Sequence, residues 1–391
     1  MLLAMKTFTA TVGLLLTATL ACTGDTSGQP HDLLKGRPLD GFRPVTAWRG
    51  VNEVSAVNGK TEFTYQGEGS VLVNGAAFDK SIPFLMTREE FGDVRVELEF
   101  MVPKNSNAGI YLLGRYETQI LDSFGRTRFG SGDLGGIYQR WDPSLPQGKQ
   151  GFEGLAPKVN AAKPPGEWQT MEIIFRAPRF SEDGKKFRDA TFEKVFVNGV
   201  LVQENATTTG PTRSAPFEGE TSHGPIAIQG DHGPIAIRKF QVTPLPDPEI
   251  QRLAALDAYW TEVSHSVKTG DFALYQAKCH EKAVLVSGSK RVSYPLSQAL
   301  ARWKKEFDDT KAGTRESSVE FRFAHRYGDA TTAHESGVFC YTWKQGDGEA
   351  TPEYVEFEAL LLKEGDSWKI LMEYQKAAVE KAKWDALAPG H

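Results

Sequence analysis

The sequence predicts an all-β sandwich of the jelly-roll type, followed by a smaller α+β domain with a curved antiparallel sheet. The first observation is that short apolar runs alternate with Gly, Pro, Asn and Asp clusters between residues 39 and 244, as in sandwiches of many short strands. The second is a proline-rich segment at 243–248. The third is a helical pattern followed by long strand-like runs, which is typical of an α+β domain. The length of 391 residues suits about two to three domains.

The N-terminal segment has the pattern of a secretory signal peptide. Lys6 precedes the apolar run Phe8–Leu20, and a positive charge before such a run directs export. The pair Ala21-Cys22 resembles a bacterial lipobox, in which the cysteine is acylated, although Thr19 stands where leucine is usual. We therefore expect an exported lipoprotein of the periplasm or cell envelope, anchored through Cys22 to a membrane such as the outer membrane. Secretion after a plain cut behind Ala21 is the alternative.

Charge and cysteine content limit the partners of the chain. The formal net charge is −5 and no Lys/Arg block occurs, so nucleic acid is not an expected partner. Beyond the signal segment no apolar run is long enough to cross a bilayer, so membrane contact is expected only through the lipid. Besides Cys22, Cys279 and Cys340 remain; they can pair in an oxidising compartment or stay free. The chain divides into a signal peptide at 1–21, a tether at 22–36, a β-rich domain at 37–245 and a last domain at 246–391.

Several strands of the β-rich domain are clear from the sequence. They are Ser70–Leu72, Val94–Met101, Gln169–Arg176, Phe192–Val197 and Val200–Val202. The turn Asn198-Gly199 between the last two is a strong hairpin signal. The run Val94–Phe100 alternates cleanly between apolar and charged residues, so one face of that strand is expected to contact water.

Residues 105–125 are expected to form two strands joined at Gly114, because an apolar, β-branched run is bounded there by polar and turn residues. Side chains on a strand alternate between two faces. The core face would carry Ile110, Leu112, Tyr116, Thr118 and Ile120. The other face would carry Tyr111, Leu113, Arg115, Glu117 and Gln119. An aromatic ring, a guanidinium, a carboxylate and an amide on one face favour a sugar-binding cleft, and an ordinary solvated face is the alternative.

The five-residue segment GPIAI occurs twice, at 224–228 and 233–237. We expect the two copies to form a local hairpin rather than an architectural repeat. The link between them is Gln229-Gly230-Asp231-His232, and its glycines permit a tight turn that projects both polar side chains. His232 is then a candidate acid or base, because histidine changes charge nearest neutral pH.

The last domain begins with two predicted helices, Glu249–Lys268 and Leu296–Phe307, where apolar residues recur at helical spacing. Four strands are expected after them, at Ser318–Tyr327, Thr331–Trp343, Tyr354–Glu364 and Ser367–Tyr374. The pattern of residues 249–385, with VEFEALLLKEGDSWKILMEYQ its most recognisable piece, resembles the nuclear-transport-factor-like cone fold of SnoaL-type proteins. That fold hosts cyclases, isomerases and binding modules, and a homodimer through this domain is one hypothesis. Candidates for a base in its cavity are His265, His280, His325 and His334.

Five strings in the first domain carry a second resemblance. In chain order they are SNAGIYLLGRYETQILDSFG, GGIYQRWDP, VNAAKPPGEWQTMEIIFRAPRF, VFVNGVLVQENATTTGPT and GPIAIQGDHGPIAIRKFQV. On these strings, residues 37–244 resemble the 3-keto-glycoside lyase/hydratase family, also called 3-keto-disaccharide hydrolases, whose fold is a concanavalin- or laminarinase-like jelly roll. Leu113 stands where the family frequently has a polar residue, and Lys239 where asparagine is usual.

The resemblance implies an enzyme for glycosides oxidised at C3, which an upstream sugar 3-dehydrogenase would supply. The C3 ketone acidifies the C2 proton, so its removal expels the C1 aglycone by β-elimination, and water then adds to the enone. This chemistry needs a base, a donor to the enolate oxygen and a proton donor for the leaving group. The expected catalytic residues are Glu117, His232 and Asp122. The expected substrate-binding residues are Tyr111, Arg115, Gln119, Trp141, Gln229 and Asp231.

Asp122 needs one irregularity in its strand, because strict alternation puts it on the core face. A β-bulge between Gln119 and Asp122 would return it to the face of Glu117. The spacing would then resemble that of laminarinase-type retaining β-glucanases, in which two carboxylates about 5 Å apart act as nucleophile and acid. Retaining hydrolysis is therefore the second hypothesis, and a carbohydrate-binding module without catalysis is the third. No cofactor is fixed by the sequence; Glu117, Asp122 and His232 are candidate ligands for a divalent metal that would polarise the ketone.

Overall fold

The computed structural model describes residues 28–181 and 183–387. They divide into two compact units, with the boundary along the chain between Leu245 and Pro246. Each unit is described separately. The predicted signal peptide, Cys22 and the first part of the predicted tether lie outside the described residues. No helix within the described ranges is long and apolar enough to cross a membrane.

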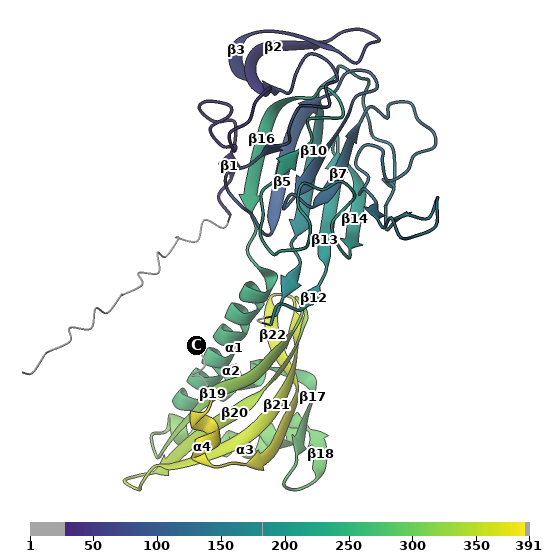
Figure 1. Cartoon of the computed structure of the whole chain (residues 1–391). Coiled ribbons are helices and arrows are strands. Elements are labelled where there is room, and N and C mark those ends of the chain that lie inside the picture. The colour runs from purple at the N-terminus through teal and green to yellow at the C-terminus, as the bar shows by residue number, and fades with distance from the viewer. Residues whose placement is uncertain (1–27, 182, 388–391) are drawn as a thin grey trace, which may run out of the picture. The chain divides into compact units, whose positions relative to one another are not determined.

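The first unit is a sandwich of two antiparallel sheets, as the sequence predicts. The larger sheet has eight strands, and Figure 1 shows β16, β5, β10 and β13 side by side within it. In spatial order its strands are β14 (Val200–Thr208), β13 (Ala190–Val197), β10 (Gln169–Arg176), β5 (Val94–Met101), β16 (Ala236–Pro244), β3 (Phe63–Val73) and β2 (Arg49–Ala56), with β1 (His31–Asp32) paired to β16.

The smaller sheet has four strands and carries the residues of most functional interest. In spatial order they are β4 (Leu85–Met86), β15 (Ala227–Ile228), β6 (Asn107–Leu112) and β7 (Tyr116–Leu121). Two short ribbons, β8 (Arg140–Trp141) with β9 (Gly151–Phe152) and β11 (Arg179–Phe180) with β12 (Lys186–Arg188), belong to the connections.

The core lies between the two sheets and explains the alternation along β5. Val94, Val96 and Leu98 are buried in it together with apolar residues of β6 and β7. The charged residues of β5 point to the other face, where Glu97 pairs with Lys239 at 2.9 Å. One face of this strand therefore contacts water, as its alternation predicts.

The tether prediction is wrong for the part that the structure describes, residues 28–36. His31 pairs with Val242 of β16, and Leu33 and Leu34 are buried in the core of the sandwich. The Leu33 amide donates to the Phe240 carbonyl at 2.9 Å. The folded unit therefore includes residues before the predicted boundary at 37.

The local hairpin predicted for the repeated GPIAI segment is also wrong. The first copy contributes β15, which pairs with β4 and β6 of the smaller sheet. The second copy contributes β16, which pairs with β1, β3 and β5 of the larger sheet. The link Gln229–His232 therefore crosses from one sheet to the other, so its side chains lie at an edge of the sandwich.

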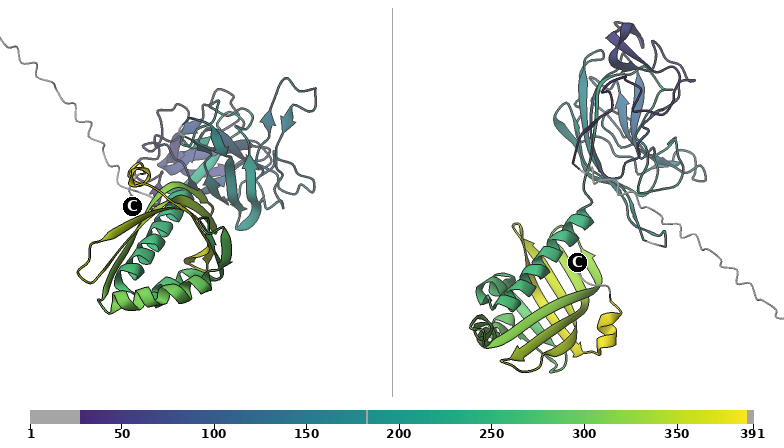
Figure 2. Two further views of the ribbon diagram at one scale, coloured as in Figure 1. Left: turned by 90° about the horizontal axis from the view of Figure 1, so that it is seen from below. Right: turned by 90° about the vertical axis from the view of Figure 1, so that its left-hand side faces the viewer.

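The second unit has the predicted cone fold, a curved sheet wrapped against helices. Its strands in spatial order are β18 (Val292–Pro295), β17 (Cys279–Ser287), β22 (Ser367–Ala378), β21 (Thr351–Glu364), β20 (Thr332–Gln345) and β19 (Arg315–Gly328). Its helices are α1 (Pro248–Thr269), α2 (Phe272–Ala277), α3 (Leu296–Lys311) and α4 (Lys381–Asp385). Figure 2 shows, from two further sides, the sheet curving with α1 on its inner side.

Local signals fix the start and end of α1. Asp247 caps its first turn by accepting the Glu249 amide, and Gly270 ends it in the left-handed conformation with φ of 69°. Its buried face, which includes Leu256 and Trp260, packs into the core of the cone. Cys279 and Cys340 are both free thiols.

Candidate functional site

The candidate site is built on the hairpin of β6 and β7. The two strands pair without a register shift, so Tyr111 lies opposite Glu117 and Gly109 opposite Gln119. Their turn uses two residues with positive φ, Leu113 at 55° and Gly114 at 64°. Because side chains opposite each other share a face, Tyr111, Glu117 and Gln119 lie together, while Ile110, Leu112, Tyr116 and Ile120 of the same hairpin are buried in the core.

Glu117 is the most unusual group on this face, because its carboxyl is buried. Only 1% of the residue is exposed. Burial raises the pKa of Glu117 to about 8, and the negative charge of Asp231 acts in the same direction. Its side chain lies over Gly109, where an added Cβ would come within 2.0 Å of Oε1. Glycine at 109 therefore makes room for the carboxyl.

Two polar neighbours of Glu117 oppose this shift. The Tyr111 hydroxyl and the Gln119 side chain lower the pKa of the carboxyl, but less than burial raises it. Their contacts are long or poorly aligned, since neither carboxylate oxygen has a partner of ordinary hydrogen-bond geometry among the described residues. Burial and the nearby carboxylates also raise the pKa of Tyr111, so that its hydroxyl stays protonated. The group is therefore a neutral acid beside a neutral phenol at pH 7.

The link between β15 and β16 brings a second pair of polar side chains to this face. The backbone amide of Gln229 donates to the Gly109 carbonyl at 2.9 Å, which aligns the start of the link with β6. Three residues on, His232 Nδ1 lies 2.7 Å from Asp231 Oδ1. The His232 side chain is 49% exposed and that of Asp231 32%. The imidazole is thus held through Nδ1, which leaves Nε2 as its outward nitrogen.

Asn74, the residue after β3, fixes the position of this link. Its Nδ2 donates to the carbonyls of Gly230 and Gly233, both at 2.8 Å. Its Oδ1 accepts the Ile235 amide at 2.8 Å. Asn74 is fully buried, so these bonds are shielded from water. One side chain from the larger sheet therefore clamps both ends of the turn that carries Asp231 and His232.

We predict that Asn74→Ala destabilises the protein by about 3 kcal/mol or more, because two carbonyls and one amide would lose their partner in a buried place. The midpoint of urea unfolding measures this effect, with Asn58→Ala as the matched exposed control. The turn that carries Asp231 and His232 would also lose its anchor in this variant. An unchanged midpoint would contradict the role assigned to this clamp.

Arg115 does not join the other predicted site residues. Its Nε donates to the Gly219 carbonyl at 3.0 Å, and its Nη1 to that of Leu113 at 2.8 Å. The guanidinium lies over the ring of Phe217, 5.2 Å from its centroid. Arg115 therefore holds the hairpin turn to the 217–219 loop, because the turn at Gly114 interrupts the alternation on which its placement was based.

Asp122 is likewise separated from Glu117, because the predicted β-bulge is absent from the pairing of Asn107–Leu112 with Tyr116–Leu121. The Asp122 amide continues the ladder by donating to the Ser106 carbonyl at 3.0 Å. Its carboxylate accepts the Asn105 amide at 2.9 Å and pairs with Lys104 at 3.3 Å. These contacts fix the loop before β6.

Trp141 lies on the short ribbon of β8 and β9 and is 37% exposed. The Arg213 guanidinium covers one side of its ring, 3.8 Å from the centroid, so only the other side is available for stacking on a sugar. Within the described residues, no group of three or more His, Cys, Asp and Glu side chains is arranged to hold a metal ion. The candidate ligands Glu117, Asp122 and His232 accordingly do not form such a group.

Sequence reasoning missed Asn74, Gly109, Asn107 and Tyr138. Asn107 lies on the face of Glu117, and its buried Oδ1 has no hydrogen-bond partner among the described residues. The Tyr138 amide donates to the Glu117 carbonyl at 3.0 Å. Asn107 and Gly109 could have been found by extending the alternation of side chains along the strand from Tyr111. Asn74 and Tyr138 reach the site through long-range contacts that no local sequence pattern indicates.

Comparisons with known proteins found one family model and several solved structures. A family model described as a 3-keto-alpha-glucoside-1,2-lyase-like domain matches residues 30–243. A Parabacteroides distasonis structure provisionally described as a glycosyl hydrolase is 28% identical and covers 55% of this chain and 84% of its own, with a TM-score of 0.37. An NTF-2-like protein of unknown function from Shewanella oneidensis is 17% identical and covers 32% of this chain and 97% of its own, with a TM-score of 0.26. No curated protein matched the sequence.

Proposed function

The chain belongs to the 3-keto-alpha-glucoside-1,2-lyase-like family, and from this premise we propose that it cleaves 3-keto-glycosides by β-elimination followed by hydration. The family makes it a carbohydrate-active protein. The observation that supports this reaction is the presence of two different titratable groups. His232 is exposed and held by Asp231, whereas Glu117 is a buried carboxyl whose pKa lies far above its usual range. Two titratable groups in such different environments are suited to opposite roles in proton transfer.

We assign the removal of the C2 proton to His232. With Nδ1 directed at Asp231, the lone pair of Nε2 points outward, and the carboxylate stabilises the imidazolium that forms. The electrons of the C2–H bond move into the C1–C2 bond, and the C1–O bond to the aglycone breaks. The product is an enone with its carbonyl at C3, to which water adds oxygen at C1 and a proton at C2.

We assign the proton for the departing aglycone to Glu117. With a pKa near 8, the carboxyl is protonated at neutral pH and can act as a general acid. Because only 1% of Glu117 is exposed, its carboxyl can donate only to a substrate atom that lies directly against the hairpin face, beside Tyr111 and Asp231. The substrate is therefore expected to lie against the hairpin face, with C2 turned toward His232. The Tyr111 hydroxyl and the Gln119 side chain are the neutral groups beside the Glu117 carboxyl, which becomes negatively charged as it gives up its proton.

Retaining hydrolysis gains less support, because it needs a second carboxylate about 5 Å from the first. The candidate for this role, Asp122, is engaged with Asn105 and Lys104. The carboxylate that acts electrostatically on Glu117 is Asp231, and it holds His232. Elimination uses this arrangement directly, since it needs one base and one acid rather than a nucleophile.

Two parallel incubations test the proposal. We expect the protein to release the chromogenic aglycone from 4-nitrophenyl 3-keto-glucoside and not from the plain 4-nitrophenyl glucoside, because only the ketone acidifies the C2 proton. Aglycone release from the plain glucoside would favour the retaining glycosidase. Saturable binding of both compounds without release from either would indicate a binding module. The same incubations with heat-denatured protein correct for spontaneous elimination.

A further inference from the structure

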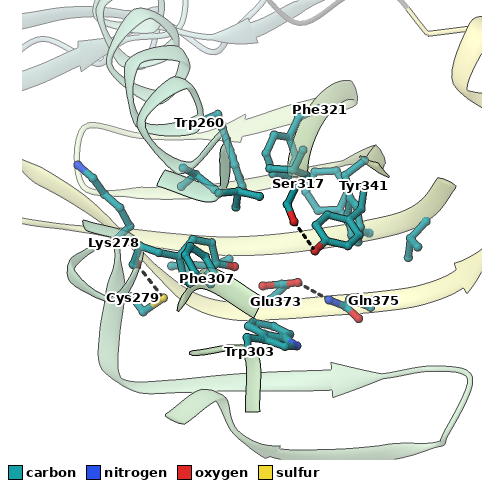
Figure 3. Close-up of a pocket in the computed structure, with 18 of the residues that line it drawn as sticks. Trp260, Lys278, Cys279, Trp303, Phe307, Ser317, Phe321, Tyr341, Glu373 and Gln375 are labelled. Carbon is teal, nitrogen blue, oxygen red and sulfur yellow. Dashed lines mark hydrogen bonds between the residues drawn. The ribbon is translucent and has the colours of Figure 1, made fainter. Parts of the chain in front are cut away.

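The cone of the second unit encloses a cavity of about 290 Å³ that the proposed reaction does not use. Much of its wall is aromatic, with contributions from α1, α3 and the sheet, and Figure 3 shows Trp260, Trp303, Phe307 and Phe321 around it. An engineered cavity of about 150 Å³ holds one benzene ring. A cavity nearly twice as large therefore suits a ligand of about two fused rings.

Three acids interrupt the apolar lining, namely Glu306, Glu353 and Glu373. Glu373 of β22 lines the cavity, and Figure 3 shows its carboxyl beside the Gln375 side chain, whose Nε2 donates to Oε1 at 2.6 Å. The surrounding protein shields this carboxyl from bulk water, and this burial raises its pKa. The residue nonetheless keeps part of its surface accessible, as expected of a side chain that faces a cavity.

The remaining charged groups at the cavity argue against an anionic ligand. Among its lining residues Lys278 alone is a cation, and it is paired with Glu262. Glu306 accepts the Tyr341 hydroxyl at 3.1 Å and pairs with Arg315 at 3.3 Å. Glu353, the third acid of the lining, is exposed. No lining cation is thus left without an acidic partner in the described part of the chain, whereas the acid at 373 faces the space.

We propose that this cavity binds a neutral, flat molecule of about two fused rings, whose carbonyl or other acceptor oxygen takes a hydrogen bond from the Glu373 carboxyl. The aromatic wall supplies ring contacts, which favour offset and edge-to-face packing. Gln375 donates to Oε1, so Oε2 is the oxygen left for the hydrogen bond to the ligand. Its lining residues all belong to the second unit, whereas the residues assigned to keto-glycoside cleavage belong to the first.

The four histidines that the sequence offered as a cavity base do not line the cavity. His280 is paired with Glu364 at 3.0 Å, and His334 lies 3.7 Å from Glu358. The His325 ring stacks on Tyr327 with centroids 5.5 Å apart. None of these, nor His265, is among the lining residues, so none of the four histidines can act as a base in this cavity.

Calorimetric titration of the full chain with 2-acetonaphthone tests the proposal, because this probe has two fused rings and one carbonyl. We expect one binding site per chain. Glu373→Gln keeps a donor of the same shape and should stay within about threefold of the wild-type affinity. Glu373→Leu removes the donor and should weaken binding by about three- to tenfold, the effect of one hydrogen bond. The anion 2-naphthoate should bind at least about tenfold more weakly than 2-acetonaphthone.

Three further variants make the result decisive. Val355→Trp fills the cavity and should abolish binding, whereas Glu320→Leu, an exposed acid on β19, should leave it unchanged. His232→Asn should also bind the probe normally, which separates this site from the proposed catalytic one. Absence of binding heat with the wild type, equal affinity in Val355→Trp, or equal affinity of 2-naphthoate would each overturn the proposal. If Glu373→Leu does not fold, Val355→Trp and 2-naphthoate still decide it.

Discussion

Replacement of His232 by asparagine is expected to lower kcat on a 3-keto-glucoside by about 10²- to 10⁴-fold, the usual contribution of a general base. Asparagine can still contact Asp231 but cannot take up the C2 proton. The thermal unfolding midpoint should hardly change, because the His232 side chain is 49% exposed and contributes little packing. Steady-state release of the aglycone, together with a thermal scan, measures both effects.

His223 provides the matched control for this variant. It is an exposed histidine of the same unit, and its Nδ1 lies 3.2 Å from the hydroxyl of the adjacent Ser222. His223→Asn should retain wild-type turnover. Turnover within about threefold of wild type in His232→Asn would remove the imidazole from the mechanism, whatever the other residues do.

Glu117→Gln is expected to lower kcat by about 10²- to 10⁴-fold as well, because the amide has the shape of the carboxyl but no acidic proton. In the wild type, the active form of Glu117 is the protonated one. Since its pKa is about 8, turnover should decline as the pH rises through this value. The pH–rate profile of the wild type measures this decline, and the residual activity of the variant should lack it.

The same variant should change how stability depends on pH. The folded-state pKa of Glu117 lies above its ordinary value of 4.5, at about 8. The folded state therefore holds its proton more tightly than the unfolded state, and this contribution to stability is complete below pH 4.5 and lost as the pH rises to 8. Relative to the variant, the wild type should lose on the order of 4 kcal/mol over this interval.

Urea unfolding of both proteins at pH 5 and pH 8 measures this difference directly. Glu68→Gln, which replaces an exposed acid of β3, is the control and should follow the wild type at both pH values. Parallel stability curves for wild type and Glu117→Gln would show that the carboxyl is ionised in the folded protein at neutral pH. The assignment of Glu117 as the acid would then be wrong.

Much of the architecture could be predicted because local signals agree with it. The alternation of Val94–Met101 reflects one buried and one wet face, and β5 has the predicted bounds. The pair Asn198-Gly199 supplies two successive positive φ angles, 52° and 78°, which a tight hairpin turn requires. The two large helices and the four long strands of the cone were found for the same reason, since each repeats its period over many residues.

The wrong predictions concern residues whose position depends on a strand or loop that is distant in the sequence, which a local pattern does not indicate. The two GPIAI copies are equally apolar, so the sequence does not indicate that they belong to different sheets. Arg115 was placed by counting through Gly114, where the turn resets the alternation. In the cone, Glu373 and Gln375 look like the wet face of a strand, and only the curvature of the sheet turns them toward an enclosed space. Asn74 acts over 156 residues of chain, as its bond to Gly230 shows.

In the proposed reaction, the face of the β6–β7 hairpin, with His232 beside it, removes a proton from the carbon next to a sugar ketone. The most direct test is cleavage of a 3-keto-glycoside in D₂O, followed by NMR of the released 3-keto-sugar at early times. Elimination and hydration predict one deuterium at C2, in amounts that match aglycone release and exceed the exchange seen with His232→Asn. Full aglycone release with protium retained at C2 would contradict the account.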